Sequence, residues 1–124
     1  MKKKPVQLSL FPEKSKDFSK LQKDYIFGYV SDRSVYVGKQ QLLPAKSQKV
    51  RNYSPDGFCW GYGGSGAAQL ALAILLHYFD KLDAIRFHHT FKWEVIAELE
   101  QFKDFKIPRV IIDNIVSKYK YNTQ

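Results

Sequence analysis

The middle of this 124-residue chain reads Gly57-Phe58-Cys59-Trp60-Gly61-Tyr62-Gly63-Gly64-Ser65-Gly66 and continues into an apolar run, Ala67 to Phe79. On a helix this run is apolar on nearly every face, and only Gln69, His77 and Tyr78 interrupt it. A helix that is hydrophobic all round belongs in the interior of a protein. We therefore expect residues 67–79 to form the central helix, with the glycine block as the turn that leads into it.

Two short runs of β-branched and aromatic residues precede the glycine block. Residues 25–30 and 35–37 flank the polar residues 31–34, which is the pattern of a β-hairpin. If the first strand stays unpaired on its other side, its edge could also join two copies of the chain. Residues 40–55 are mostly polar, contain Pro44, and are expected to form a loop.

Two more helices are expected after the central one. The first is capped by Asp83, and its apolar stripe has four-residue spacing: Phe87, Phe91, Val95 and Leu99. The second starts at Pro108, a residue that is acceptable at a first helical position, and its stripe is Ile111, Ile115 and Tyr119. These elements predict an α+β fold in which a small antiparallel sheet, the N-terminal hairpin, packs with three helices around one core.

Length and composition favour one domain with a tail. A chain of 124 residues with 44% hydrophobic content can build one core but not two. Residues 1–24 are polar, charged and without periodicity, which predicts a disordered basic tail, and residues 25–124 are expected to form a single small domain. The longest apolar stretch is too short to span a membrane, and no signal-peptide core follows Met1-Lys2-Lys3-Lys4. We expect a cytoplasmic protein.

Residues with catalytic or metal-binding chemistry are few. Cys59 is the single cysteine, and it forms no metal-ligand spacing with His77, His88 or His89. The sequence offers no set of acid, base and nucleophile, so we expect neither an enzyme nor a bound metal or cofactor.

The net charge of +8 is distributed unevenly. Seven lysines lie in residues 2–23, and Lys39, Lys46, Lys49 and Arg51 form a second run without an acid. Such charge attracts nucleic acid without regard to its sequence. Lys46, Lys49 and Arg51 are therefore candidate DNA contacts, although a solvated surface that keeps the protein soluble explains them equally well. No motif for sequence-specific recognition accompanies them.

One short peptide in the tail indicates a partner. Gln7, Leu8, Ser9, Leu10 and Phe11 resemble the pentapeptide with which bacterial proteins dock on the DNA sliding clamp. In an extended chain Leu10 and Phe11 are apolar anchors, and the Gln7 amide can bind polar groups at the rim of a cleft. The alternative is an edge strand or a tether that packs Leu8 and Phe11 on the domain itself.

The glycine block and its surroundings are very similar to the signature of a small family known as domain of unknown function 6166. The matching motifs are Ser54-Pro55-Asp56-Gly57-Phe58, Trp60 to Gly66, Gln69 to Leu75, Tyr36-Val37-Gly38 and Phe91-Lys92-Trp93. The resemblance implies a setting in bacteria, plasmids, integrating elements or phages, without an established activity. Cys59 replaces a residue that is often acidic in the family, and Ala67 replaces the usual proline.

The glycine block also suggests an anion site. Gly61, Tyr62, Gly63, Gly64, Ser65 and Gly66 precede a helix, whose unpaired N–H groups and dipole attract a phosphate or carboxylate. Gly61, Gly63 and Gly66 fit G-x-G-x-x-G, but the chain lacks the parallel sheet that dinucleotide binding requires. The structural alternative is a sharp turn that lets Trp60 and Tyr62 pack on the helix. Candidates for a base-stacking surface are Tyr53, Trp60, Tyr62 and Trp93, although core packing explains these aromatic residues equally well.

Two functions of different classes follow. The first is a non-enzymatic accessory protein, tethered by its tail to the clamp and so to replicating DNA. The second is a binding protein for a phosphate or nucleotide, which uses the amides of residues 61–66.

Overall fold

A four-stranded antiparallel sheet, with strand order β3-β2-β1-β4, forms one layer of the computed structural model, which describes residues 25–122. The strands are β1 (Tyr25–Tyr29), β2 (Ser34–Val37), β3 (Gln40–Leu42) and β4 (Phe105–Pro108). The register places Phe27 of β1 opposite Tyr36 of β2 and opposite Lys106 of β4. The hairpin predicted from residues 25–37 is therefore the centre of a larger sheet, which also recruits a strand from far along the chain.

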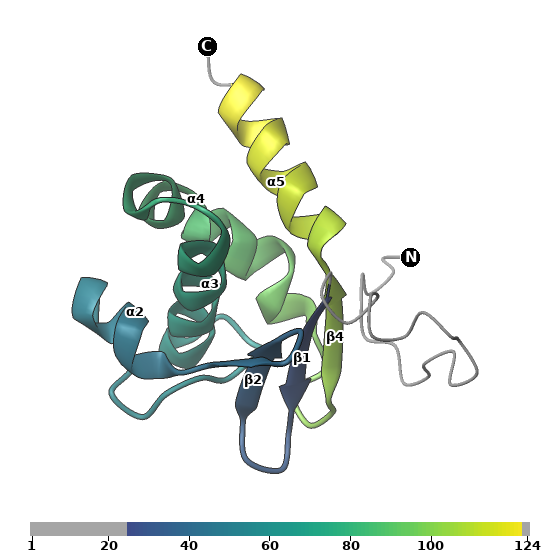
Figure 1. Cartoon of the computed structure of the whole chain (residues 1–124). Helices are drawn as coiled ribbons and strands as arrows, with labels where there is room; N and C mark the ends of the chain where they lie inside the picture. The colour runs from purple at the N-terminus through teal and green to yellow at the C-terminus, as the bar shows by residue number, and fades with distance from the viewer. Residues whose placement is uncertain (1–24, 123–124) are drawn as a thin grey trace.

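Within residues 25–122, four α-helices and one short 3-10 helix complete the α+β fold. They are α2 (Pro44–Val50), α3 (Ser65–Tyr78), α4 (Lys81–Glu94), η1 (Ile96–Glu98) and α5 (Arg109–Asn122). Figure 1 shows α2, α3 and α4 grouped on one side of the sheet, while α5 leads away from the end of β4. No helix in residues 25–122 is both long enough and apolar enough to cross a membrane.

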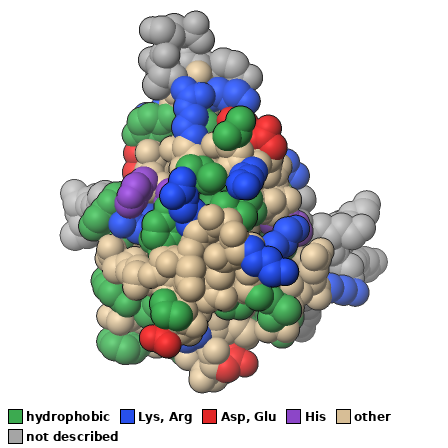
Figure 2. Space-filling view, turned by 90° about the vertical axis from the view of Figure 1, so that its left-hand side faces the viewer, with side chains coloured by type: hydrophobic (Ala, Val, Ile, Leu, Met, Phe, Trp, Pro, Cys, Tyr) green, Lys and Arg blue, Asp and Glu red, His purple; other side chains and the backbone are tan. Residues whose placement is uncertain are grey.

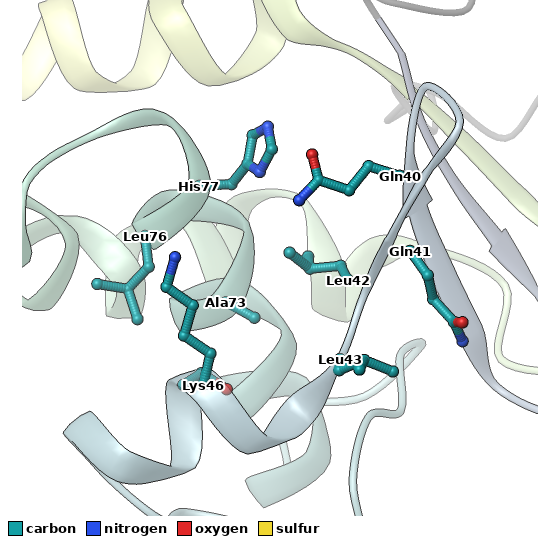
Figure 3. A pocket seen from close by; sticks show the side chains of 9 residues that line it. Gln40, Gln41, Leu42, Leu43, Lys46, Ala73, Leu76 and His77 are labelled. Atoms are coloured by element: carbon teal, nitrogen blue, oxygen red, sulfur yellow. The ribbon is translucent and has the colours of Figure 1, made fainter.

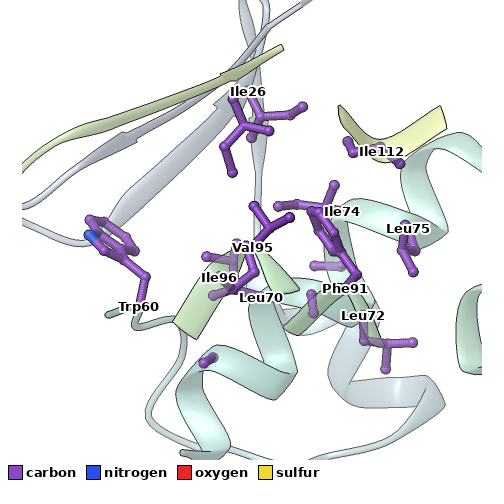
Figure 4. Packing of buried hydrophobic residues seen from close by; sticks show 14 of the residues in the cluster. Ile26, Trp60, Leu70, Leu72, Ile74, Leu75, Phe91, Val95, Ile96 and Ile112 are labelled. Carbon is purple, nitrogen blue, oxygen red and sulfur yellow. The ribbon is translucent and has the colours of Figure 1, made fainter. Parts of the chain in front are cut away.

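Helix α3 is the centre of the core, as its uniform apolarity predicts. Ten consecutive residues, Gly66 to Leu75, are buried. Figure 4 shows Leu70 and Ile74 of α3 among side chains from the sheet, α4 and α5, including Ile26, Phe91 and Ile112. Burial of each large aliphatic side chain stabilises the fold by about 1.5–3 kcal/mol, so α3 is the largest contributor to the core.

Helix α4 begins earlier and ends earlier than the sequence pattern predicts. Its N-cap is Asp80, whose Oδ1 accepts a hydrogen bond from the Asp83 N–H at 2.9 Å, so the predicted cap at Asp83 is wrong. An N-cap residue bonds the amide three positions later, and this is the position that Asp83 occupies. Val95 and Leu99 are buried as predicted, but they lie beyond the end of α4, on either side of η1.

The sequence pattern predicts a loop at residues 40–55, and this prediction is wrong. The segment contains β3 and α2. Pro44 stands in the first turn of α2, where its missing N–H has no intrahelical partner to lose. The buried Gln69 of α3 holds this segment. Its Oε1 accepts hydrogen bonds from the N–H groups of Tyr53 (2.7 Å) and Ser54 (2.9 Å). Its Nε2 donates to Ser47 Oγ (2.9 Å) and to the Arg51 carbonyl (3.0 Å).

Strand β4 overturns two further expectations: that a helix starts at Pro108, and that the first strand has an unpaired edge. Pro108 is the last residue of β4, opposite Tyr25, and α5 starts at Arg109. A proline that faces the end of a strand removes no hydrogen bond from the middle of the sheet. Strand β1 pairs with β2 on one side and β4 on the other, so it offers no free edge for a second copy of the chain. The sheet edges are β3 and β4.

Candidate functional site

The glycine turn, residues 57–66, is closely packed, and at two of its glycines the neighbouring atoms come from α4 or from the segment after it. Gly61 has a left-handed φ of 87°, and a methyl group there would lie 2.4 Å from Cα of Gln101. Its N–H donates to the Ile96 carbonyl at 3.0 Å. A methyl group at Gly63 would lie 2.2 Å from the Trp93 ring. Gly61 is therefore required by close approach of the segment that follows α4, and Gly63 by close approach of the last turn of α4, which favours the structural interpretation of the motif.

The last turn of α4 supplies the side chains that hold this turn. Lys92 is only 6% exposed, and its Nζ donates to the Gly63 carbonyl at 3.3 Å. The same Nζ lies 4.3 Å from the centre of the Trp93 ring, a cation–π distance. The motif residues Phe91-Lys92-Trp93 thus meet the motif residues 61–66 in space. A positive charge in the last turn of α4 also complements the dipole of that helix.

The start of α3 is open in the way that an anion site requires. Its N-cap is Gly64, which has no side chain to bond the amides of the first turn. No acidic residue lies in that turn, and Ser65 is exposed. The positive end of the helix dipole is therefore not offset by a local carboxylate, while the Lys92 ammonium is close by. This arrangement can attract a phosphate or a carboxylate.

Cys59 and Tyr62 are neighbours within the glycine turn. The Cys59 sulfur, through its charge as a thiolate, raises the pKa of the Tyr62 hydroxyl; partial burial adds to this shift and Arg33 opposes it. The Arg33 guanidinium lies 4.5 Å above the ring of the buried Trp60. The Cys59 N–H donates to the Gly66 carbonyl at 3.2 Å, so Cys59 fixes the path of the turn.

The four aromatic residues considered for base stacking do not form one surface. Trp60 is buried: its Nε1 donates to the Lys103 carbonyl at 3.0 Å, and its ring packs edge-on against Phe105. Tyr53 packs on the ring of His88. Only Tyr62 and Trp93 flank the glycines with exposed rings. Phe102, 77% exposed, directly follows Gln101, and nothing in the local sequence pattern marks it as a surface residue of this region.

The histidines are separated along the helical hairpin. His77 lies in the last turn of α3, while His88 and His89 stack on each other in α4 at 4.9 Å. His88 is 3% exposed, and its Nδ1 bonds the Ile85 carbonyl at 2.7 Å. Burial, more than the nearby charges of His89, Lys92 and Arg51, lowers the pKa of His88. Within residues 25–122, no three His, Cys, Asp or Glu side chains gather in a group that could hold a metal ion.

The basic residues considered for DNA contact lie on one short element. Lys46 and Lys49 are exposed on α2, one turn apart, and Arg51 is the exposed C-cap of that helix. Figure 2 shows the face of the molecule on the α2 side, where Lys and Arg side chains are interspersed with hydrophobic ones and Asp and Glu lie mainly at the margins. The docking peptide, Gln7 to Phe11, lies outside the described residues.

The fold and the glycine turn define a small α+β domain built on a Gly-rich entry into a buried helix. The chain matches the family of unknown function DUF6166 over residues 28–118 and belongs to that family. The match includes the glycine turn, α3 and the last turn of α4. No curated protein and no solved structure gives a significant match to the chain.

Proposed function

We propose that this protein is a non-enzymatic interaction protein that docks on the bacterial DNA sliding clamp through Gln7 to Phe11. The observation that carries the proposal is the peptide itself, Gln7-Leu8-Ser9-Leu10-Phe11, in a lysine-rich stretch between Pro5 and Pro12. Burial of Leu10 and Phe11 in a cleft would contribute roughly 1.5–3 kcal/mol each. The cost of ordering the peptide reduces this gain, so we expect an affinity of about micromolar.

The position of the peptide supports its use as a tether. The buried core of the described residues extends from Ile26 to Val116, and 13 residues separate Phe11 from Tyr25. Fully extended, a segment of that length reaches about 45 Å. A domain held on such a tether has a high local concentration near DNA, which strengthens weak contacts. Lys46, Lys49 and Arg51 on the α2 side would supply the non-specific contact with nucleic acid.

The resemblance to proteins of plasmids, integrating elements and phages suggests the setting of this activity, in the cytoplasm of a bacterium. A protein from a mobile element gains from the clamp in either of two ways. It can bring the element to the replication fork, or it can occupy the cleft and exclude host proteins. Both ways require the same docking step, which is the step to test.

The test is calorimetric titration of a bacterial sliding clamp with the full chain. We expect binding in the micromolar range, abolished by the double substitution Leu10→Ala/Phe11→Ala. The matched control is Phe18→Ala/Leu21→Ala, which removes two apolar side chains from the same segment outside the peptide. Equal binding by the wild-type chain and the first double variant would refute the proposal, and so would equal loss in both variants.

A second candidate function is binding of a phosphate-bearing ligand at the start of α3. The observation that favours it is an uncapped helix start beside the Lys92 ammonium, with the exposed rings of Tyr62 and Trp93 on either side. Ser65→Asp separates binding from stability, because a carboxylate in the first turn stabilises a helix but repels an anion. We expect ATP or inorganic phosphate to raise the melting temperature of the wild type and of Ser65→Ala, but not of Ser65→Asp. An equal rise in all three would refute this site.

A further inference from the structure

A cavity lies away from the glycine turn, between the edge strand β3, α2 and the end of α3. Its cavity has a volume of about 200 Å³. Leu42 from the strand and Ala73 and Leu76 from the helix form apolar walls. An apolar protein cavity of about 150 Å³ accommodates a benzene molecule. The cavity therefore has room for one ring or a short aliphatic chain, together with a small polar group.

The polar side chains of this cavity border the same space. Figure 3 shows the Gln40 side-chain amide next to the His77 ring and the Lys46 ammonium across the cavity from them, while Gln41 is turned away. These three groups can all donate hydrogen bonds. Ser47 also lines the cavity, but its hydroxyl is already used: it donates to the Pro44 carbonyl and accepts from Gln69 Nε2.

The electrostatic environment of the cavity is positive. None of the described residues that line it is Asp or Glu. Within residues 25–122, no carboxylate forms an ion pair with Lys46. Burial first, and then the charges of Lys46 on α2 and Arg109 on α5, lower the pKa of His77. His77 is also in edge-on contact with the Tyr78 ring. A negative ligand would relieve the repulsion among these groups, since it introduces the charge that the cavity lacks.

We propose that this cavity binds a small organic carboxylate with an apolar body. The carboxylate would accept hydrogen bonds from the Lys46 ammonium and the Gln40 amide, and the His77 ring would lie beside it. The apolar body would lie on Leu42, Ala73 and Leu76. Charge-assisted hydrogen bonds of this kind are about twice as strong as neutral ones, so the charge of the ligand decides its affinity. The site is independent of the docking peptide and of the glycine turn.

The test is an NMR titration of the full chain with benzoate, and with benzyl alcohol as a neutral analogue of similar shape. We expect saturable shifts for benzoate at the Gln40 side-chain amide, the His77 ring and the Leu42 and Leu76 methyl groups, with weaker or no binding of benzyl alcohol. Bound benzoate should raise the pKa of His77, and its affinity should increase as the pH falls through the titration of that ring. This pH profile reports on contact with His77 itself.

Substitutions on α2 supply the matched comparison. Lys46→Met keeps the aliphatic part of the side chain but removes the ammonium, and we expect benzoate to bind at least about tenfold more weakly. Lys49→Met removes a charge one turn away that does not line the cavity, and the affinity should change by less than about twofold. The proposal is overturned by an absence of saturable shifts, by shifts located elsewhere, by equal binding of benzyl alcohol, or by equal loss in both variants.

Discussion

The glycine turn and the corner made by residues 40–54 are fixed in place by opposite means. At the turn, side chains are missing: Gly61 and Gly63 let the Gln101 backbone and the Trp93 ring approach where a methyl group would overlap them. At the corner, one side chain does the work: Gln69 binds four groups of the segment from the interior of α3. The difference teaches that a conspicuous motif, here the glycine turn, can mark tight packing. The cavity lined by Gln40, Leu42 and Lys46 lies instead beside the corner, whose sequence has no recognisable motif.

The largest effect is expected at the turn, from Gly61→Ala. The new methyl group meets the backbone of Gln101, which cannot move aside as a side chain can, and the φ of 87° strains any L-residue. We expect a loss of about 4 kcal/mol or more in the free energy of unfolding, measured by urea denaturation. Gly63→Ala is the control, since the new methyl group meets only the half-exposed Trp93 ring and should cost about 1–2 kcal/mol. A loss for Gly61→Ala no larger than that for Gly63→Ala would contradict the role given to the Gln101 backbone and to the φ of Gly61.

The corner is broken by Gln69→Leu, with a somewhat smaller expected loss. The substitution keeps the volume of the side chain but leaves the Tyr53 and Ser54 amides and the Arg51 carbonyl without this partner. We expect a loss of about 3 kcal/mol in the free energy of unfolding. The control is Gln48→Ala, which removes a single hydrogen bond to the Ser54 carbonyl, 2.8 Å long, and should cost about 1 kcal/mol. If Gln69→Leu lost as little stability as Gln48→Ala, the corner would be held by contacts among residues 40–54 and not by Gln69.

The smallest expected effect is a pH dependence that distinguishes the corner from the turn. Tyr53 of the corner packs on His88, whose pKa is lowered mainly by burial from its ordinary value of 6.5. The folded state then binds fewer protons than the unfolded state, so stability decreases as the pH falls below about 6.5. The slope for His88 cannot exceed about 1.4 kcal/mol per pH unit.

The substitution His88→Phe tests this assignment, because it keeps a ring against Tyr53 and removes the titration. Thermal unfolding measured between about pH 7.5 and pH 5 should show a weaker pH dependence in this variant than in the wild type. His77, whose pKa is also lowered, should supply the remainder. An unchanged pH dependence would contradict the role given to His88.

The sequence predicts those parts of the fold that local patterns encode. The uniform apolarity of residues 67–79 identifies the central helix, and the β-branched runs at 25–30 and 35–37 identify the hairpin, because burial follows from hydrophobic periodicity. The sequence analysis places the N-cap of α4 three residues too late, at Asp83 in place of Asp80. Both residue types are equally suitable as caps, and only the geometry of the first turn distinguishes them.

Long-range interactions explain what the sequence does not reveal. Strand β4 is only four residues long and forms because β1 is available to pair with it. Helix α2 has no apolar stripe to predict it, and it is held in place by Gln69, some 20 residues later. At the candidate site, the glycines and Trp93 can be identified from the sequence. The contacts of the Lys92 ammonium with the Gly63 carbonyl and the Trp93 ring cannot. The cavity beside Lys46 combines three elements, none of which has a motif for it.

The position of β1 between β2 and β4 affects how the protein folds during its synthesis on the ribosome. Strand β1 is synthesised first, but one of its two neighbours, β4, consists of residues 105–108. A nascent chain that has emerged only as far as α4 therefore carries the central strand with one side unoccupied, which is the state in which strands pair with the wrong partner. Folding has to wait for nearly the whole domain to leave the exit tunnel. The sheet can close only after β4 has left the exit tunnel, in a step slowed by the large separation of its paired strands along the chain.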